Sequence, residues 1–138
     1  MGLTIVDASV VIAALDDADA LHRRSTAALT TSDRLVLPAS ALAEAMVRPH
    51  RDGRATEVRS SLDALGFEIE PLTEAIADRA AALRARHASM RLGDALVLAT
   101  AETIDADRIL TGDTRWPGWS DRVEVVTPAP ESAPGEPG

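Results

Sequence analysis

The sequence predicts an α/β fold, a single domain with a central, mostly parallel sheet of about four to five short strands and helices on both faces. Short β-branched apolar segments alternate along the chain with longer segments whose apolar residues recur at helical spacing. A chain of 138 residues has room for one complete hydrophobic core. Because its aromatic residues are only Phe67, Trp116 and Trp119, that core must be built from Ala, Val, Leu and Ile.

The first part of the chain is predicted to form two strands, each followed by helices. Residues 3–6, LTIV, are short, apolar and continuous, as expected of a buried parallel strand, and a helix follows the turn at Asp7. A second helix is expected to begin near Asp19, since an acid suits a first turn. Residues 34–38, RLVLP, form the second strand, and the alanine-rich residues 39–48 form the next helix.

The rest of the chain continues this alternation and then changes in composition. The spacing predicts helices over 54–65 and 73–90 and a third one opened by Asp94, and strands over 67–72, 108–111 and 122–126. The last twelve residues, TPAPESAPGEPG, hold half of the prolines and no apolar anchor beyond alanine. We therefore expect a domain over residues 1–126 and a disordered C-terminal tail over residues 127–138.

Composition excludes several kinds of chemistry. The chain has no cysteine and no lysine, which removes disulfides, thiolate metal sites, Schiff bases and a lysine that grips phosphate. Its net charge of −8 repels nucleic acid unless the arginines cluster locally. The apolar residues 3–15 are interrupted by Asp7, lack a basic leader and are too short to span a bilayer, so we expect a cytoplasmic protein with no membrane partner.

Four acids are predicted to meet at one edge of the sheet. In open α/β sheets, ligands bind beyond the carboxyl ends of the strands, and Asp7 and Asp113 follow the strands at 3–6 and 108–111. Glu44 projects from the helix after the second strand, and Asp94 opens a helix. Carboxylates gathered there would raise one another's pKa unless cations neutralised them. Oxygen ligands without cysteine or clustered histidine select Mg²⁺ or Mn²⁺, and the expected chemistry is phosphodiester hydrolysis.

Each acid also has a structural alternative. Asp7 and Asp94 lie where helix caps are expected, Asp113 lies in a turn, and Glu44 could belong to a solvated helix face. Their joint position at one predicted edge favours a site over four separate coincidences. A phosphoacceptor receiver domain also gathers acids around Mg²⁺, but its site resembles one completed by a lysine, which this chain lacks.

Basic and aromatic residues next to the acids are candidates for binding substrate. Arg91 precedes Asp94, and Arg115 with Trp116 follows Asp113. An arginine can grip phosphate and a tryptophan can stack on a base. The alternative for the arginines is an ordinary surface ion pair.

The segments IVDASVVIAAL, LGDALVLATA and ILTGDTRW, together with Glu44 in a helix after a short strand, resemble the PIN-domain nucleases. The size of the chain resembles the VapC-type toxins of bacterial toxin–antitoxin pairs, and the resemblance covers residues 3 to about 126. One difference is Gly93, because the family pattern commonly has a polar residue or a proline before the acid that corresponds to Asp94.

The resemblance implies a Mg²⁺- or Mn²⁺-dependent endoribonuclease that acts on RNA. It implies that the four acids together hold the metal. Within that set we expect the three aspartates to be the direct ligands and Glu44 to act through a metal-bound water or as a proton acceptor. It also implies a homodimer and a small cognate antitoxin whose basic C-terminal segment lies across the acids. A catalytically silent PIN-shaped module that binds protein or RNA remains the alternative. The residues that the resemblance assigns are the catalytic Asp7, Glu44, Asp94 and Asp113, with Ser9 and Thr111 as supporting hydroxyls.

Overall fold

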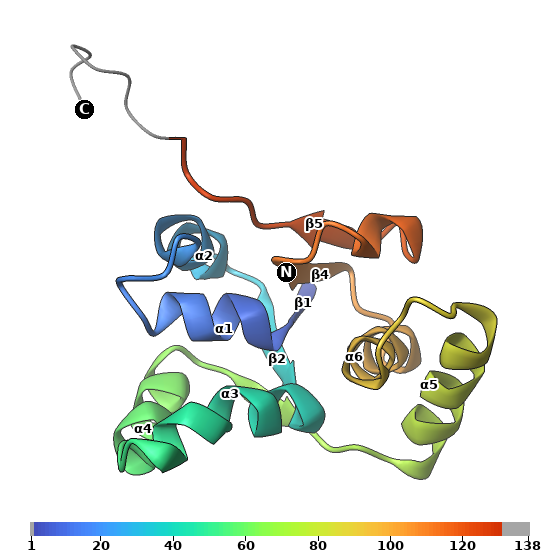
Figure 1. Cartoon of the computed structure of the whole chain (residues 1–138), viewed down its shortest axis with the longest axis horizontal. Coiled ribbons are helices and arrows are strands. Elements are labelled where there is room, and N and C mark those ends of the chain that lie inside the picture. The colour runs from blue at the N-terminus through green and yellow to red at the C-terminus, as the bar shows by residue number, and fades with distance from the viewer. Residues whose placement is uncertain (1, 131–138) are drawn as a thin grey trace.

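A five-stranded parallel sheet in the order β3-β2-β1-β4-β5 forms the centre of the molecule, a computed structural model that describes residues 2–130. Figure 1 shows α1 and α2 on one side of β1 and β2, and α5 and α6 on the other. The predicted α/β fold is confirmed. The strands are β1 (Leu3–Val6), β2 (Arg34–Pro38), β3 (Glu68–Glu70), β4 (Arg108–Thr111) and β5 (Val123–Val125). The helices are α1 (Ala8–Ala14), α2 (His22–Leu29), α3 (Ala39–Arg51), α4 (Ala55–Ala64), α5 (Glu74–Arg86), α6 (Leu92–Thr103) and the short 3-10 helix η1 (Trp116–Gly118).

The central strands end at the same level, which decides where the site lies. β1 pairs with β4 so that Val6 lies opposite Leu110, and the backbone N–H of Asp7 donates to the Leu110 carbonyl at 2.9 Å. Both apolar residues are fully buried, as expected of strands covered on both faces. The residues that follow β1 and β4 therefore emerge side by side at the carboxyl edge of the sheet.

The core is aliphatic, as the composition predicts, with one exception. Val, Ile, Leu and Ala from the central strands and from α1, α3 and α6 make up most of the buried cluster. Trp116 of η1 is the largest side chain in it and is 0% exposed. This burial ties the loop after β4 to the domain core.

Two helix starts differ from the prediction. α2 begins at His22 because the Asp19 carboxylate accepts a hydrogen bond from the N–H of Leu21 at 2.8 Å and holds a turn before the helix. α6 begins at Leu92, so Asp94 lies in the first turn and does not open the helix. Its carboxylate accepts from the Arg91 N–H at 3.0 Å, which satisfies a free donor at the helix start.

The division into a domain over 1–126 and a disordered tail over 127–138 stays a prediction. Residues 131–138 of that tail lie outside the described residues. Over residues 2–130, no helix is both long enough and apolar enough to cross a membrane.

Candidate active site

The orientation of the Asp7 carboxylate is fixed by hydrogen bonds from two hydroxyl groups. Its Oδ2 atom accepts hydrogen bonds from Ser9 Oγ at 2.8 Å and from Thr111 Oγ1 at 3.0 Å. Ser9 Oγ accepts in turn from the N–H of Gly112 at 3.0 Å, and Thr111 Oγ1 accepts from the N–H of Asp113 at 3.1 Å. The ends of β1 and β4 are thus joined through side chains, and the loop that carries Asp113 is held beside Asp7.

Burial and neighbouring acids both act on Asp7 and Glu44. Burial raises the pKa of Asp7, the hydrogen bonds from Ser9 and Thr111 oppose that rise, and Asp94 adds to it. Burial also raises the pKa of Glu44, and the negative charges of Asp7 and Asp94 raise it further. Carboxylates from the end of β1, from α3 and from α6 therefore lie close enough to repel one another, as is expected of a site that binds a cation.

Glu44 reaches this edge of the sheet through a gap at the start of α6. A Cβ atom added to Gly93 would lie 2.4 Å from Glu44 Oε1, closer than two such atoms can approach. The missing side chain of Gly93 therefore leaves the space that the Glu44 carboxylate fills. On its other side, Glu44 lines a cavity of about 230 Å³ together with Ile12 and Arg48.

Asp113 is paired with an arginine from its own loop. Arg115 Nη2 lies 2.6 Å from Asp113 Oδ2, and the Nε and backbone N–H groups of Arg115 also donate to Asp113. These hydrogen bonds hold the pKa of Asp113 below its usual range. The same Nη2 atom lies 3.7 Å from Asp94 Oδ2. Arg115 thereby links two of the acids and supplies the positive charge that a metal ion would otherwise bring to them.

The structure thus brings together all four predicted acids, Asp7, Glu44, Asp94 and Asp113, which we call the acidic cluster. Among residues 2–130, no group of three or more histidine, aspartate or glutamate side chains is placed so that it could hold a metal ion as the side chains stand. The donor set nevertheless fits Mg²⁺ or Mn²⁺, because every candidate donor is a carboxylate or hydroxyl oxygen and two of the carboxyls have raised pKa values. In this structure the carboxylate of Asp113 is occupied by Arg115.

The predicted substrate-binding residues differ in their exposure to solvent. Arg91 is exposed, and its charge acts on both Glu44 and Asp113. The stacking role predicted for Trp116 is wrong, because its fully buried ring presents no face to a ligand. The sequence reasoning missed Trp119, which is partly exposed and lies under the Arg115 guanidinium, 5.6 Å from its ring centroid. The spacing within TRWPGW does not reveal which of the two indole rings is buried.

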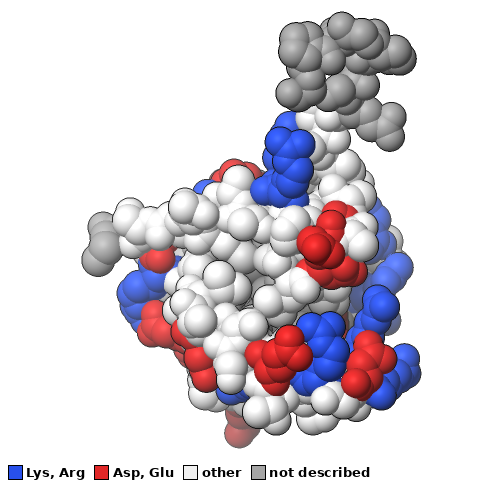
Figure 2. All heavy atoms as spheres, turned by 90° about the vertical axis from the view of Figure 1, so that its left-hand side faces the viewer, with Lys and Arg blue, Asp and Glu red and all other residues white. Residues whose placement is uncertain are grey.

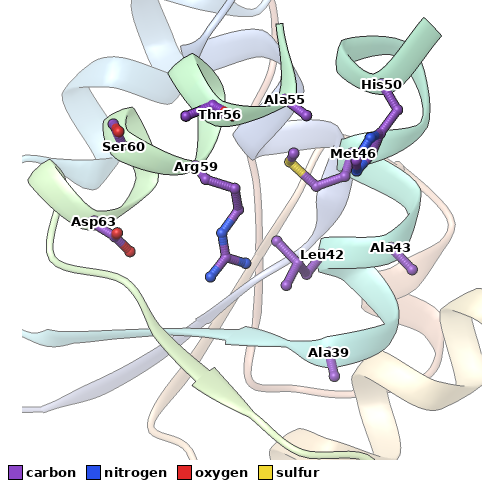
Figure 3. A pocket seen from close by; sticks show the side chains of 10 residues that line it. All are labelled: Ala39, Leu42, Ala43, Met46, His50, Ala55, Thr56, Arg59, Ser60 and Asp63. Atoms are coloured by element: carbon purple, nitrogen blue, oxygen red, sulfur yellow. The ribbon is translucent and has the colours of Figure 1, made fainter. Parts of the chain in front are cut away.

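A second hollow is separate from the acidic cluster. It lies between α3 and α4, where Leu42 and Met46 face Arg59 across the gap (Figure 3). None of its lining residues belongs to the cluster. The face shown in Figure 2 carries acidic and basic side chains interspersed around an uncharged centre. This side of the molecule therefore lacks a continuous basic surface.

We expect Asp7→Asn to raise the melting temperature at neutral pH by a few degrees when a chelator is present. Burial raises the pKa of Asp7 above its unfolded value, so the ionised carboxylate destabilises the folded state at pH 7. The stability that the protonated form contributes is fully present below the unfolded pKa and is lost as the pH rises through the higher folded pKa. The advantage of Asp7→Asn should therefore shrink as the pH is lowered. Calorimetric melting from pH 7 downward measures it, and a variant that melts below wild type at pH 7 contradicts the reasoning.

Comparisons with known proteins bear on the family and the fold of the chain. The family described as PIN domain matches residues 4–119. No curated protein sequence matches the chain significantly. Among solved structures, a toxin–antitoxin complex from Klebsiella pneumoniae is similar at 24% identity and a TM-score of 0.75, with 88% of this chain and 96% of that chain covered. VapC20 of Mycobacterium tuberculosis, described as a sarcin–ricin loop cleaving toxin, is similar at 17% identity and a TM-score of 0.70, covering 86% and 97%. FitAcB of Neisseria gonorrhoeae is similar at 20% identity and a TM-score of 0.68, covering 92% and 97%.

Proposed function

Because the chain belongs to the PIN-domain family, we propose that it is a metal-dependent endoribonuclease that hydrolyses RNA at the acidic cluster. The observation that carries the proposal is the convergence of Asp7, Glu44 and Asp94 from three separate segments, close enough for their charges to add to the rise that burial causes in the pKa of Asp7 and of Glu44. Structural needs alone do not account for such an arrangement, because unneutralised carboxylates that lie close together destabilise the fold.

The four acids have two roles in the proposed hydrolysis, binding the metal and accepting a proton. Asp7, Asp94 and Asp113 would hold the cation, and the hydroxyls of Ser9 and Thr111 fix the orientation of Asp7. Mg²⁺ or Mn²⁺, when bound, would supply charge stabilisation at the phosphate and a more acidic water. Glu44, whose pKa is raised, would accept the proton of the attacking water or hold the cation through a water. Arg115 leaves Asp113 for a substrate phosphate, which a guanidinium binds through two parallel hydrogen bonds.

We further propose that the protein is the toxin of a toxin–antitoxin pair and forms a homodimer. The similar structure from Klebsiella pneumoniae is a toxin–antitoxin complex. The pairing of Arg115 with Asp113 and Asp94 shows that the cluster accommodates a guanidinium group. An antitoxin with a basic C-terminal segment would place an arginine there and exclude metal and RNA together. A catalytically silent PIN-shaped module is the alternative.

The test of the nuclease proposal is cleavage of a mixed RNA pool by the purified protein. We expect cutting with Mg²⁺ or Mn²⁺ and none with a chelator. Cutting that continues in the chelator would point to a contaminating nuclease. A protein that stays inert with either metal while it binds a basic partner would favour the silent module.

We expect an arginine-containing segment to compete with metal. Saturating tri-arginine peptide should weaken the binding of Mn²⁺ severalfold, because a guanidinium pairs with two carboxylate oxygens at once. Tri-lysine carries the same charge without the planar fork and should compete less. Titration of Mn²⁺ by electron paramagnetic resonance measures both peptides without any RNA. Equal affinity for Mn²⁺ with and without tri-arginine would count against inhibition by this route.

A further inference from the structure

A basic segment of the chain directly precedes Asp94 of the acidic cluster. Residues 79–93 contain four arginines and one histidine but no acid, although the chain as a whole has a net charge of −8. Three of these arginines, Arg84, Arg86 and Arg91, are exposed. They lie at the end of α5 and in the connection to α6, on the right-hand side of Figure 1, away from the mixed charges in Figure 2. The local field there favours a polyanion.

A group of three flat side chains joins this basic segment to the acids. The guanidinium of Arg115 lies 5.6 Å from the centroid of the Trp119 ring, and the His87 ring is tilted by 44° to that ring with its centroid 6.4 Å away. Arg115 also donates to the carbonyl of Ser89, at 3.4 Å. We call His87, Arg115 and Trp119 the aromatic shelf. Because Arg115 reaches both Asp113 and Asp94, the shelf begins where the acidic cluster ends.

An exposed aromatic ring is unusual in this chain. The chain has three Phe, Tyr or Trp residues, and two of them, Phe67 and Trp116, are buried in the core. Trp119 alone is partly exposed, and it lies against an arginine and a histidine. Indole rings, imidazole rings and guanidinium planes are the side-chain surfaces on which unpaired bases stack in RNA-binding proteins.

We propose that the aromatic shelf receives an unpaired base next to the scissile phosphate, and that Arg84, Arg86 and Arg91 bind the neighbouring phosphates. The substrate is then single-stranded RNA or an unpaired loop, because a base in a duplex is already stacked on both faces. This inference rests on the proposed nuclease function of the acidic cluster. It adds Trp119 as a substrate-positioning residue.

Fluorescence titration with a short single-stranded RNA, in the presence of a chelator so that nothing is cut, tests the shelf. Stacking should quench the emission of Trp119 in wild type, and Trp119→Phe should lose that quench while it keeps its affinity within a few-fold. Trp119→Ala should bind about 5- to 150-fold more weakly, the range for losing one base–aromatic stack. The control Leu72→Ala removes an exposed apolar side chain outside the shelf and should bind like wild type.

The arginines are tested by the salt dependence of the same titration. Arg86→Gln should reduce the slope of log affinity against log salt by about 0.7, the value for one phosphate contact on a single strand. Arg51→Gln, a change to an exposed arginine at the end of α3, should leave the slope unchanged.

Two results would contradict the proposal that the shelf binds an unpaired base. One is wild-type affinity in Trp119→Ala with no quench in wild type, and the other is a duplex of the same sequence that binds and quenches as well as the single strand. Failure of the nuclease proposal would look different. In that case the quench and its loss in Trp119→Phe would be observed, but added Mn²⁺ would produce no cleavage. The shelf would then stand as a binding site for unpaired RNA.

Discussion

Asp94→Asn is expected to reduce metal-dependent RNA cleavage by on the order of 10²- to 10³-fold, the usual cost of removing one group that stabilises transition-state charge. Asn keeps the size of the side chain and can still accept the hydrogen bond from the Arg91 N–H that caps α6. It removes the charge that acts on Glu44 and on Asp7 and that lies 3.7 Å from Arg115. Initial rates at saturating Mn²⁺, with melting curves to show that the fold is retained, measure the effect.

The matched control for Asp94→Asn is Glu102→Gln on the same helix. Glu102 forms a salt bridge with Arg79 at the other end of α6, and such partly exposed ion pairs contribute little to stability. Glu102→Gln should cut RNA at the wild-type rate. If the two substitutions lowered the rate equally, the acidic cluster would have no special role.

Gly93→Ala is expected to separate activity from stability. The new Cβ would displace the Glu44 carboxylate, because it would lie 2.4 Å from Oε1. Only the end of a flexible side chain has to move, and alanine favours a helix over glycine by about 1 kcal/mol, so the melting temperature should stay equal or rise. Cleavage should fall by about 10²-fold, as when a catalytic group is misplaced by about 1 Å. Single-turnover rates and calorimetry on the same samples check both expectations.

Gly118→Ala is the control for Gly93→Ala. A Cβ atom on Gly118 meets nothing within 4 Å, so neither stability nor cleavage should change beyond the general effect of adding a methyl group. Wild-type activity in Gly93→Ala would mean that the position of the Glu44 carboxylate is unimportant. It would remove Glu44 from the proposed machinery.

The central strands could be predicted from the sequence because they are buried on both faces. LTIV, RLVLP and RILT are short, mostly apolar segments with clear ends, and the bounds of β1, β2 and β4 match the predicted ones. The edge strands β3 and β5 are shorter than the predicted 67–72 and 122–126. An edge strand has one partner, so the length of its ladder is set by that partner and not by its own composition.

Three of the four acids could be proposed from the sequence because they lie at or near the end of a strand or the start of a helix, where topology dictates position, and Glu44 could be proposed because it lies in the helix that follows β2. The Arg115 pairing, the burial of Trp116 and the exposure of Trp119 could not be proposed in that way. They depend on how the loop after β4 packs on the core. The local sequence around Trp116 and Trp119, which are three residues apart, does not distinguish the buried ring from the exposed one. The space that Gly93 leaves for Glu44 likewise appears only when α3 and α6 are placed together.

The most direct test of the central claim is a titration of Mn²⁺ followed by electron paramagnetic resonance, in which the signal of free Mn²⁺ falls as the ion binds. The account predicts that wild type and Glu102→Gln bind Mn²⁺ at the concentrations that support RNA cleavage, and that Asp94→Asn loses this binding. Unchanged binding in Asp94→Asn, or wild-type protein that cuts RNA while it leaves the added Mn²⁺ free, would contradict a metal site at the acidic cluster.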